Sequence, residues 1–133
     1  MLADRDAIAT VAVKDMEVAK RFYEGTLGLK PAGADSGPSQ PLSNADVRVY
    51  RSGKTNFLVY KSQYAGTNKA NAVTWGLGDD LERVVQSLQA KGVVFEHYDL
   101  PGLTRKGDVH QFGTFRAAWF KDPDGNILHI NSG

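Results

Sequence analysis

The chain has 133 residues, 41% of them hydrophobic and none of them cysteine, which is enough for one domain whose core needs no disulfide bridges. Its 16 basic and 15 acidic residues nearly cancel and are scattered along the sequence, so it lacks the concentrated positive charge of a nucleic-acid-binding protein. A charged N-terminus and the lack of any apolar run of about 20 residues exclude a signal peptide and a membrane span, and we expect a cytoplasmic protein with no membrane partner.

The first half of the chain predicts a strand, a helix and three further strands. Residues 11–13 predict the first strand, Asp15 is placed to cap the helix, and Gly28 suits the left-handed position that ends it. The apolar residues of this helix predict one buried face, made of Met16, Ala19, Phe22, Tyr23 and Leu27. Strands are expected at residues 29–32, 47–50 and 56–60, and a loop at residues 31–46.

The second half repeats this order after a polar linker at residues 62–71. Asp79 or Asp80 is placed to cap a helix that ends at Gly92, and the Asp79 and Gly92 positions each follow their counterparts in the first half by 64 residues. The apolar face of this helix is predicted to be Leu81, Val84, Val85 and Leu88. Strands are expected at residues 93–98, 115–120 and 127–130, and a loop at residues 100–113.

The last hairpin carries the most specific motif of the chain. Its turn, residues 122–126 (DPDGN), is predicted to be tight because Pro123 fixes φ, Gly125 accepts a positive φ and Asp122 hydrogen-bonds the turn backbone. The hairpin aligns with the one in the first half at an offset of 70 positions, which matches Val59 to His129. The two halves therefore read as copies of one βαβββ module, at about residues 7–61 and 72–131.

The paired modules and the DPDGN turn together resemble the vicinal oxygen chelate superfamily, which includes glyoxalase I, the bleomycin-resistance proteins and the extradiol dioxygenases. The resemblance covers essentially the whole chain as a single domain. It implies an α+β fold, in which two tandem βαβββ modules form curved mixed sheets with cup-shaped cavities. It also implies a homodimer, because modules pair between chains in many relatives.

Metal-dependent members of the superfamily take four ligands from the first and last strands of the two modules. The resemblance places these positions at Ile8 or Ala9, Ala72 or Val73, Val59, and His129. At most one ligand, His129, therefore remains, whereas a catalytic divalent ion normally needs three protein ligands. His97 and His110 are expected to be exposed to solvent. We expect no cofactor, and a bound divalent metal is disfavoured.

Strand alternation predicts which side chains line the cups. If Val11, Val13, Trp75 and Leu77 face the helices, their neighbours point into the cups. The expected lining is Thr10, Ala12, Phe57, Val59, Thr74, Gly76, Ile127 and His129. Trp119 is expected to lie beside the cup, where its ring could cover a flat ligand. This largely apolar lining with two hydroxyls favours a small organic ligand, and the alternative is that side chains simply fill the cups.

The resemblance and the cup lining leave three functions open. In the first, the protein binds or sequesters a small organic molecule, such as a toxic metabolite or an antibiotic, without metal. In the second, it is a metal-independent isomerase or lyase that uses His129 as a general acid or base, since an unperturbed imidazole titrates at about 6.5. In the third, it is a metal-dependent enzyme of glyoxalase or dioxygenase type with a non-standard site.

Overall fold

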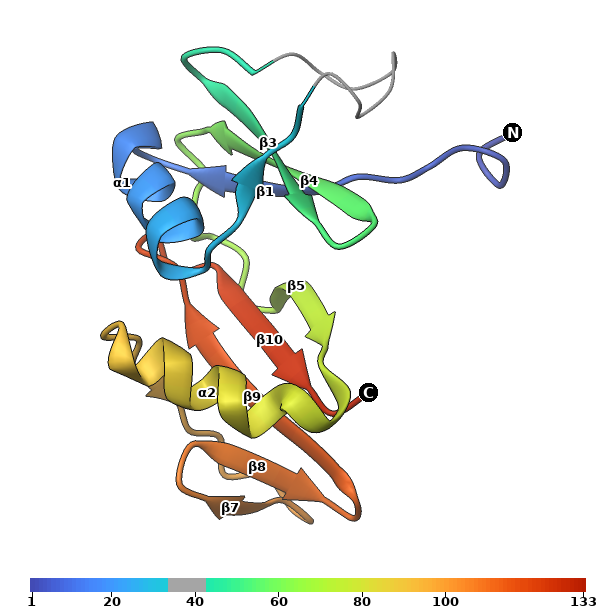
Figure 1. The fold of residues 1–133 in the computed structure, drawn as a ribbon, viewed down its shortest axis with the longest axis vertical. Coiled ribbons are helices and arrows are strands. Elements are labelled where there is room, and N and C mark those ends of the chain that lie inside the picture. The colour runs from blue at the N-terminus through green and yellow to red at the C-terminus, as the bar shows by residue number, and fades with distance from the viewer. Residues whose placement is uncertain (34–42) are drawn as a thin grey trace. The chain divides into compact units, whose positions relative to one another are not determined.

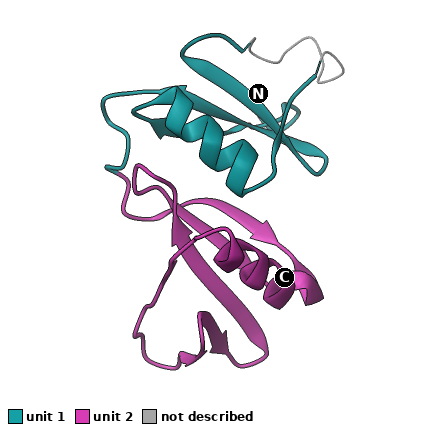
Figure 2. Cartoon of the chain, turned by 60° about the vertical axis from the view of Figure 1, so that its left-hand side comes forward, with its two compact units in different colours: residues 1–67 teal, residues 68–133 magenta. Residues whose placement is uncertain are grey.

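A computed structural model describes residues 1–33 and 43–133 of the chain (Figure 1). The chain divides into two compact units, residues 1–67 and residues 68–133 (Figure 2). Each unit combines a mixed β-sheet with one α-helix, which confirms the predicted α+β fold. None of the described helices is long and apolar enough to cross a membrane. Most of the predicted loop at residues 31–46 lies outside the described residues.

Unit 1 is built around a four-stranded sheet in the order β1-β4-β3-β2. Strand β1 runs parallel to β4, and the other pairs are antiparallel. The elements are β1 (Ala9–Val13), α1 (Met16–Lys20), the π-helix η1 (Arg21–Thr26), β2 (Lys30–Pro31), β3 (Val47–Ser52) and β4 (Thr55–Lys61). Asp15 caps α1 as predicted, because its carboxylate accepts hydrogen bonds from the backbone N–H groups of Glu17 and Val18.

The register of the unit 1 sheet corrects the predicted lining of its cup. Val11 pairs with Val59, so these two side chains lie on one face of the sheet, and both are buried. Phe57 lies on that face too, and its ring contacts Tyr23 of the helix with the ring centres 5.6 Å apart. Phe57 and Val59 therefore belong to the helix-covered core, whereas Thr10 pairs with Leu58 on the opposite face.

Unit 2 contains a six-stranded sheet in which β5-β10-β9-β8-β7 are neighbours and β6 pairs with β9. Its elements are β5 (Asn71–Gly76), the 3-10 helix η3 (Gly78–Asp80), α2 (Leu81–Ala90), β6 (Phe95–Glu96), β7 (Thr104–Lys106), β8 (Val109–Phe112), β9 (Phe115–Lys121) and β10 (Ile127–Asn131). The strand pair β5 and β10 is parallel, as β1 and β4 are in unit 1. The two units therefore repeat the same core of one parallel strand pair and one hairpin.

Helix α2 covers one face of the unit 2 sheet and buries Leu81, Val85 and Leu88, in agreement with the predicted stripe. The expected aspartate cap is wrong. Asp80 adopts helical backbone angles after the 3-10 turn and makes no side-chain cap, and its carboxylate instead pairs with Arg83. A residue already inside a helical turn cannot direct its side chain back to the first amide groups of the helix.

The predicted loop at residues 100–113 instead contains the β7–β8 hairpin. Lys106 pairs with Val109 across a two-residue turn, in which Gly107 has a φ of 61°. Two-residue hairpin turns require positive φ, which glycine adopts without steric cost. The glycines that indicated a loop therefore mark the turns of a hairpin, and this correction matters because the hairpin brings Asp108 and His110 to the sheet.

Candidate functional site

The face of the unit 2 sheet that α2 leaves uncovered carries most of the predicted ligand-binding residues. His129 pairs with Trp119 on β9 and with Thr74 on β5, so these three side chains share one face. Ile127 shares it by alternation along β10. Arg116 belongs to the other face, where it forms an ion pair with Glu82 of α2. We call the face with Thr74, Trp119, Ile127 and His129 the open face.

Trp119 lies at the centre of a group of aromatic rings on the open face. The ring of His129 lies 4.7 Å from it at 31°, and the ring of His110 lies 5.0 Å from it at 85°. Tyr98 approaches at 5.3 Å and 84°. The indole N–H donates a hydrogen bond of 3.2 Å to Oδ1 of Asn71. Three rings and one hydrogen bond thus hold Trp119 in place, and the indole remains partly exposed.

His129 is a buried imidazole whose tautomer follows from its neighbours. Asn131 accepts the backbone N–H of Gly133 at Oδ1, so its amide nitrogen faces His129 and donates to Nε2, 3.2 Å away. The proton of neutral His129 therefore resides on Nδ1, which makes no hydrogen bond of normal geometry. Burial lowers the pKa of His129 below its usual 6.5, and the backbone of Ala118 partly opposes this effect. His129 is neutral at pH 7.

His110 is buried, which corrects the expectation of an exposed side chain. Only 1% of it is exposed, and its Nε2 accepts the backbone N–H of Tyr98 at 2.9 Å. Burial lowers the pKa of His110, with smaller opposing contributions from the backbone of Ala117 and Asp108. His97 is exposed, as expected, and its Nε2 lies 2.6 Å from Oδ1 of Asp108. Two neutral histidines, His110 and His129, therefore flank Trp119.

Comparison with known proteins assigns the family. A model of the Glyoxalase/Bleomycin resistance protein/Dioxygenase superfamily matches residues 6–130. The chain belongs to this superfamily. The resemblance noted from the sequence is thereby confirmed, and it extends over nearly the full length described above.

Solved structures of the superfamily fold resemble this chain over nearly all of their length. The fosfomycin resistance protein FosX from Mesorhizobium loti is 13% identical, with a TM-score of 0.66 over 98% of this chain and 92% of that one. FosX from Listeria monocytogenes with Mn(II) and sulfate is 12% identical, with a TM-score of 0.67 over 100% of this chain and 92% of that one. An integron cassette protein, HFX_CASS4, from the mobile metagenome of a Halifax Harbour sewage outfall is 16% identical, with a TM-score of 0.64 over 98% and 99%. No curated protein matches the chain.

The residues of this superfamily member do not fit the metal site of its metal-dependent relatives. Among residues 1–33 and 43–133, no three histidine, aspartate or glutamate side chains come together in an arrangement that could hold a metal ion. At the first-strand positions stand Ile8 and Ala72, which have no ligand atom in their side chains. In unit 1 the structural counterpart of His129 is Leu58, since each pairs with a threonine of the first strand. The donor set at these positions is a single imidazole.

The structure brings together some of the predicted site residues and separates others. Thr74, Trp119, Ile127 and His129 share the open face of unit 2, and Thr10 lies on the corresponding face of unit 1. The sequence interpretation missed the contributions of Asn131, Tyr98 and His110. Strand alternation from His129 points to Asn131 two residues later, and this signal was available. No sequence signal placed Tyr98 and His110 beside Trp119, because that contact depends on the β7–β8 hairpin.

Acid should destabilise unit 2 through its two buried histidines. The pKa values of His110 and His129 are lower in the folded protein than the usual 6.5, so the unfolded state binds more protons as the pH falls below 6.5. The free energy of unfolding should therefore be constant above that pH, decline below it, and level off under the lowered pKa values. Urea unfolding at pH 7.5 and pH 5.5 measures the decline. The His129→Leu protein should lose less stability between these two pH values than the parent. An equal loss in both proteins would show that His129 does not cause it.

Proposed function

We propose that this superfamily member binds a small, planar organic molecule on the open face of unit 2 without using a metal. The observation that carries the proposal is the close, tilted ring pair of Trp119 and neutral His129, which stands at the position where metal-dependent relatives carry a ligand. The partly exposed indole offers flat apolar surface to an aromatic or heteroaromatic ring, and the buried, uncharged imidazole beside it places no charge next to that surface. The exposed hydroxyl of Thr74 and the amides of Asn71 and Asn131 can bond to polar substituents of such a ligand.

Binding is favoured over acid–base catalysis by the hydrogen bonds of His129. Its basic nitrogen, Nε2, already accepts from Asn131, so no free lone pair is directed at a ligand. The lowered pKa also makes the imidazole a weaker base. A metal-independent isomerase or lyase remains the second candidate, because a ligand oxygen that attracted the Asn131 amide would free Nε2 for proton transfer.

Replacing His129 with leucine should weaken ligand binding by roughly tenfold or more, because the variant removes the flat ring beside Trp119 and leaves the Asn131 amide without its acceptor on the imidazole. The probes are hydroxylated monocyclic and bicyclic aromatic compounds. Their binding is followed by the fluorescence of Trp119 in a Trp75→Phe protein, in which Trp119 is the one tryptophan left. Gln111→Ala is the matched control, because this side chain is exposed and donates a hydrogen bond to the carbonyl of Gly113, two residues later in the chain.

The outcomes separate the candidate functions. Saturable quenching without consumption of the compound supports binding alone. Consumption that disappears in the folded His129→Leu protein would assign the isomerase or lyase function instead. Binding that depends on added manganese or zinc would overturn the metal-free proposal. If none of the compounds perturbs Trp119, the open face does not serve as a site for planar aromatic ligands.

We also infer that the protein works as a cytoplasmic homodimer. The support for the dimer is the superfamily, whose members often form dimers. One chain has a mass of 14.5 kDa, so light scattering of the purified protein should give twice that value at micromolar concentration. A mass of one chain, unchanged on raising the concentration, would contradict the dimer.

A further inference from the structure

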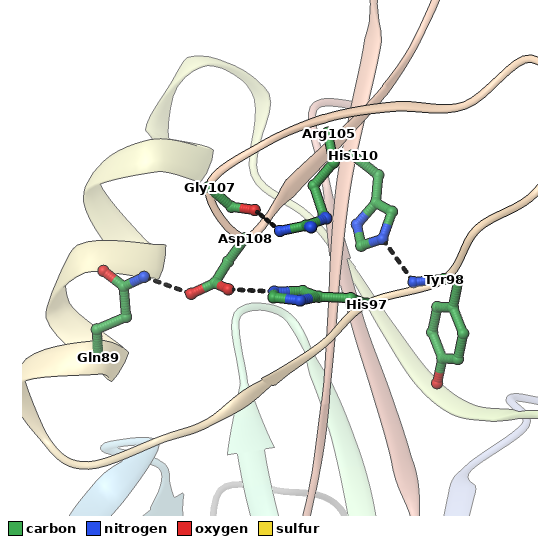
Figure 3. Close-up of polar contacts among 7 residues, drawn as sticks. All are labelled: Gln89, His97, Tyr98, Arg105, Gly107, Asp108 and His110. Carbon is green, nitrogen blue, oxygen red and sulfur yellow. Dashed lines mark hydrogen bonds and ion pairs between the residues drawn. The ribbon is translucent and has the colours of Figure 1, made fainter.

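Besides the pairing of β8 with β9, one carboxylate of the β7–β8 hairpin contacts two other segments of unit 2. Oδ1 of Asp108 lies 2.6 Å from Nε2 of His97, and Oδ2 accepts a hydrogen bond of 2.5 Å from the side-chain amide of Gln89 on α2 (Figure 3). The hydrogen bond from His97 is the main cause that lowers the pKa of Asp108, with Gln89 adding to it. The hairpin is therefore tied both to the helix and to the segment that follows β6. We call this set of contacts the Asp108 clasp.

His110 projects from the same hairpin, two residues after Asp108, and joins it to the aromatic group of the open face. Figure 3 shows its ring directed at the backbone of Tyr98, whose N–H donates to Nε2 at 2.9 Å. The His110 ring also contacts Trp119 edge to face, with the two ring centres 5.0 Å apart. With 1% of the side chain exposed, the imidazole has little room to move. Its position is thus fixed by the hairpin, and it limits in turn the positions open to the indole.

We propose that His110 is a positioning residue that holds Trp119 against His129, and that the Asp108 clasp keeps His110 in place. The inference rests on the proposed function, because it assigns His110 and Asp108 an effect on the surface that the ligand contacts. Neither residue needs to touch the ligand. Trp119 is partly exposed and contacts the rings of His110, Tyr98 and His129, so removal of the His110 ring leaves a gap into which the indole can shift toward the hairpin.

A purely structural role for His110 makes a different prediction. It would lower the free energy of unfolding without changing the contact between Trp119 and His129 in the folded protein. The deciding readouts are therefore the emission wavelength of Trp119, in the Trp75→Phe background, and the NMR shifts of the His129 ring, which the neighbouring indole perturbs. Both are measured without ligand, so they test the positioning role even if no compound binds.

The variants separate the ring of His110 from its hydrogen bond. His110→Ala should shift Trp119 emission to the red, bring the His129 ring shifts toward those of a free imidazole, and speed exchange of the Tyr98 amide roughly tenfold, as expected for a lost hydrogen bond. His110→Phe keeps a ring beside Trp119 and should restore the emission and the His129 shifts. The Tyr98 amide should remain fast in this variant, because phenylalanine has no acceptor.

The Asp108 clasp is tested with Asp108→Ala, at a side chain that is 21% exposed, and amide exchange of the β8–β9 pairing checks that the variant is folded. The variant should move the same three readouts in the same direction as His110→Ala, and Gln111→Ala should leave them unchanged. If folded His110→Ala retains the emission wavelength and His129 shifts of the parent, the positioning role is overturned. If His110→Ala does not fold, unchanged readouts in Asp108→Ala overturn it instead. Weaker ligand binding without these spectral changes would also count against the proposal.

Discussion

Replacing Asp122 with alanine should lower the free energy of unfolding of unit 2 by about 3 kcal/mol, because three hydrogen bonds end on its carboxylate. Its Oδ1 accepts the backbone N–H groups of Asp124 and Asn126, at 3.0 and 2.9 Å. Its Oδ2 accepts the side-chain amide of Asn126, at 2.8 Å. Both Asp122 and Asn126 are buried, so the variant leaves donors that water cannot reach.

Asp122→Asn is the matched control for this prediction. It keeps the shape of the side chain and one acceptor oxygen, and it should cost about 1 kcal/mol, because only the charge and one hydrogen bond are lost. Urea unfolding followed by Trp119 fluorescence in the Trp75→Phe protein measures both variants. Equal midpoints for the alanine and asparagine proteins would show that the carboxylate network does not hold the turn.

The buried network also explains why the DPDGN turn could be predicted from the sequence. Every group that fixes it lies within five consecutive residues, and glycine at position 125 adopts the expected positive φ of 89°. The helices were predictable for the same reason, since Asp15 and the apolar stripes act over one or two turns. Local chemistry decides such elements, and the sequence displays local chemistry directly.

The assignment of faces failed where two hairpins of different length were aligned. In unit 1, Ser52 pairs with Thr55 across a two-residue turn, whereas in unit 2 Lys121 pairs with Ile127 across five residues. The sequence comparison matched Val59 to His129 at an offset of 70, but the two turns differ in length by three residues. Leu58 pairs with Thr10 as His129 pairs with Thr74, so Leu58 is the counterpart of His129. The true offset between the two hairpins at this point is therefore 71. A shift of one residue exchanges the two faces of a strand, which placed Phe57 and Val59 on the wrong side.

The remaining parts of the candidate site depend on contacts between distant segments. His110 reaches Trp119 only because β8 pairs with β9 and the β7–β8 hairpin returns toward α2. Its residue type alone indicated an exposed loop histidine, because glycines surround it in the sequence. The burial that lowers its pKa is a property of the assembled sheet. Local contacts set the turn and the helices, whereas contacts between distant segments bring His110 and Tyr98 to the site. The fold was therefore predictable from the sequence, and these two contributions to the site were not.

Removing the indole of Trp119 should change both the stability and the chemistry of the open face. Trp119→Ala should cost about 2–3 kcal/mol in the free energy of unfolding, below the usual range for a fully buried tryptophan because Trp119 is partly exposed. It also removes the ring that lies 4.7 Å from that of His129, which admits water to the imidazole. Since burial is the main cause of the lowered pKa of His129, that pKa should rise toward 6.5.

Trp119→Phe separates the two effects, because phenylalanine keeps a ring over His129 and leaves a smaller void. It should recover most of the lost stability and keep the pKa of His129 lowered, as NMR titration of the imidazole would show. A planar ligand should bind the phenylalanine protein more weakly than the parent and the alanine protein hardly at all. If His129 titrates identically in all three proteins, stacking on Trp119 is not what keeps it neutral, and the ligand surface proposed for the open face loses its main support.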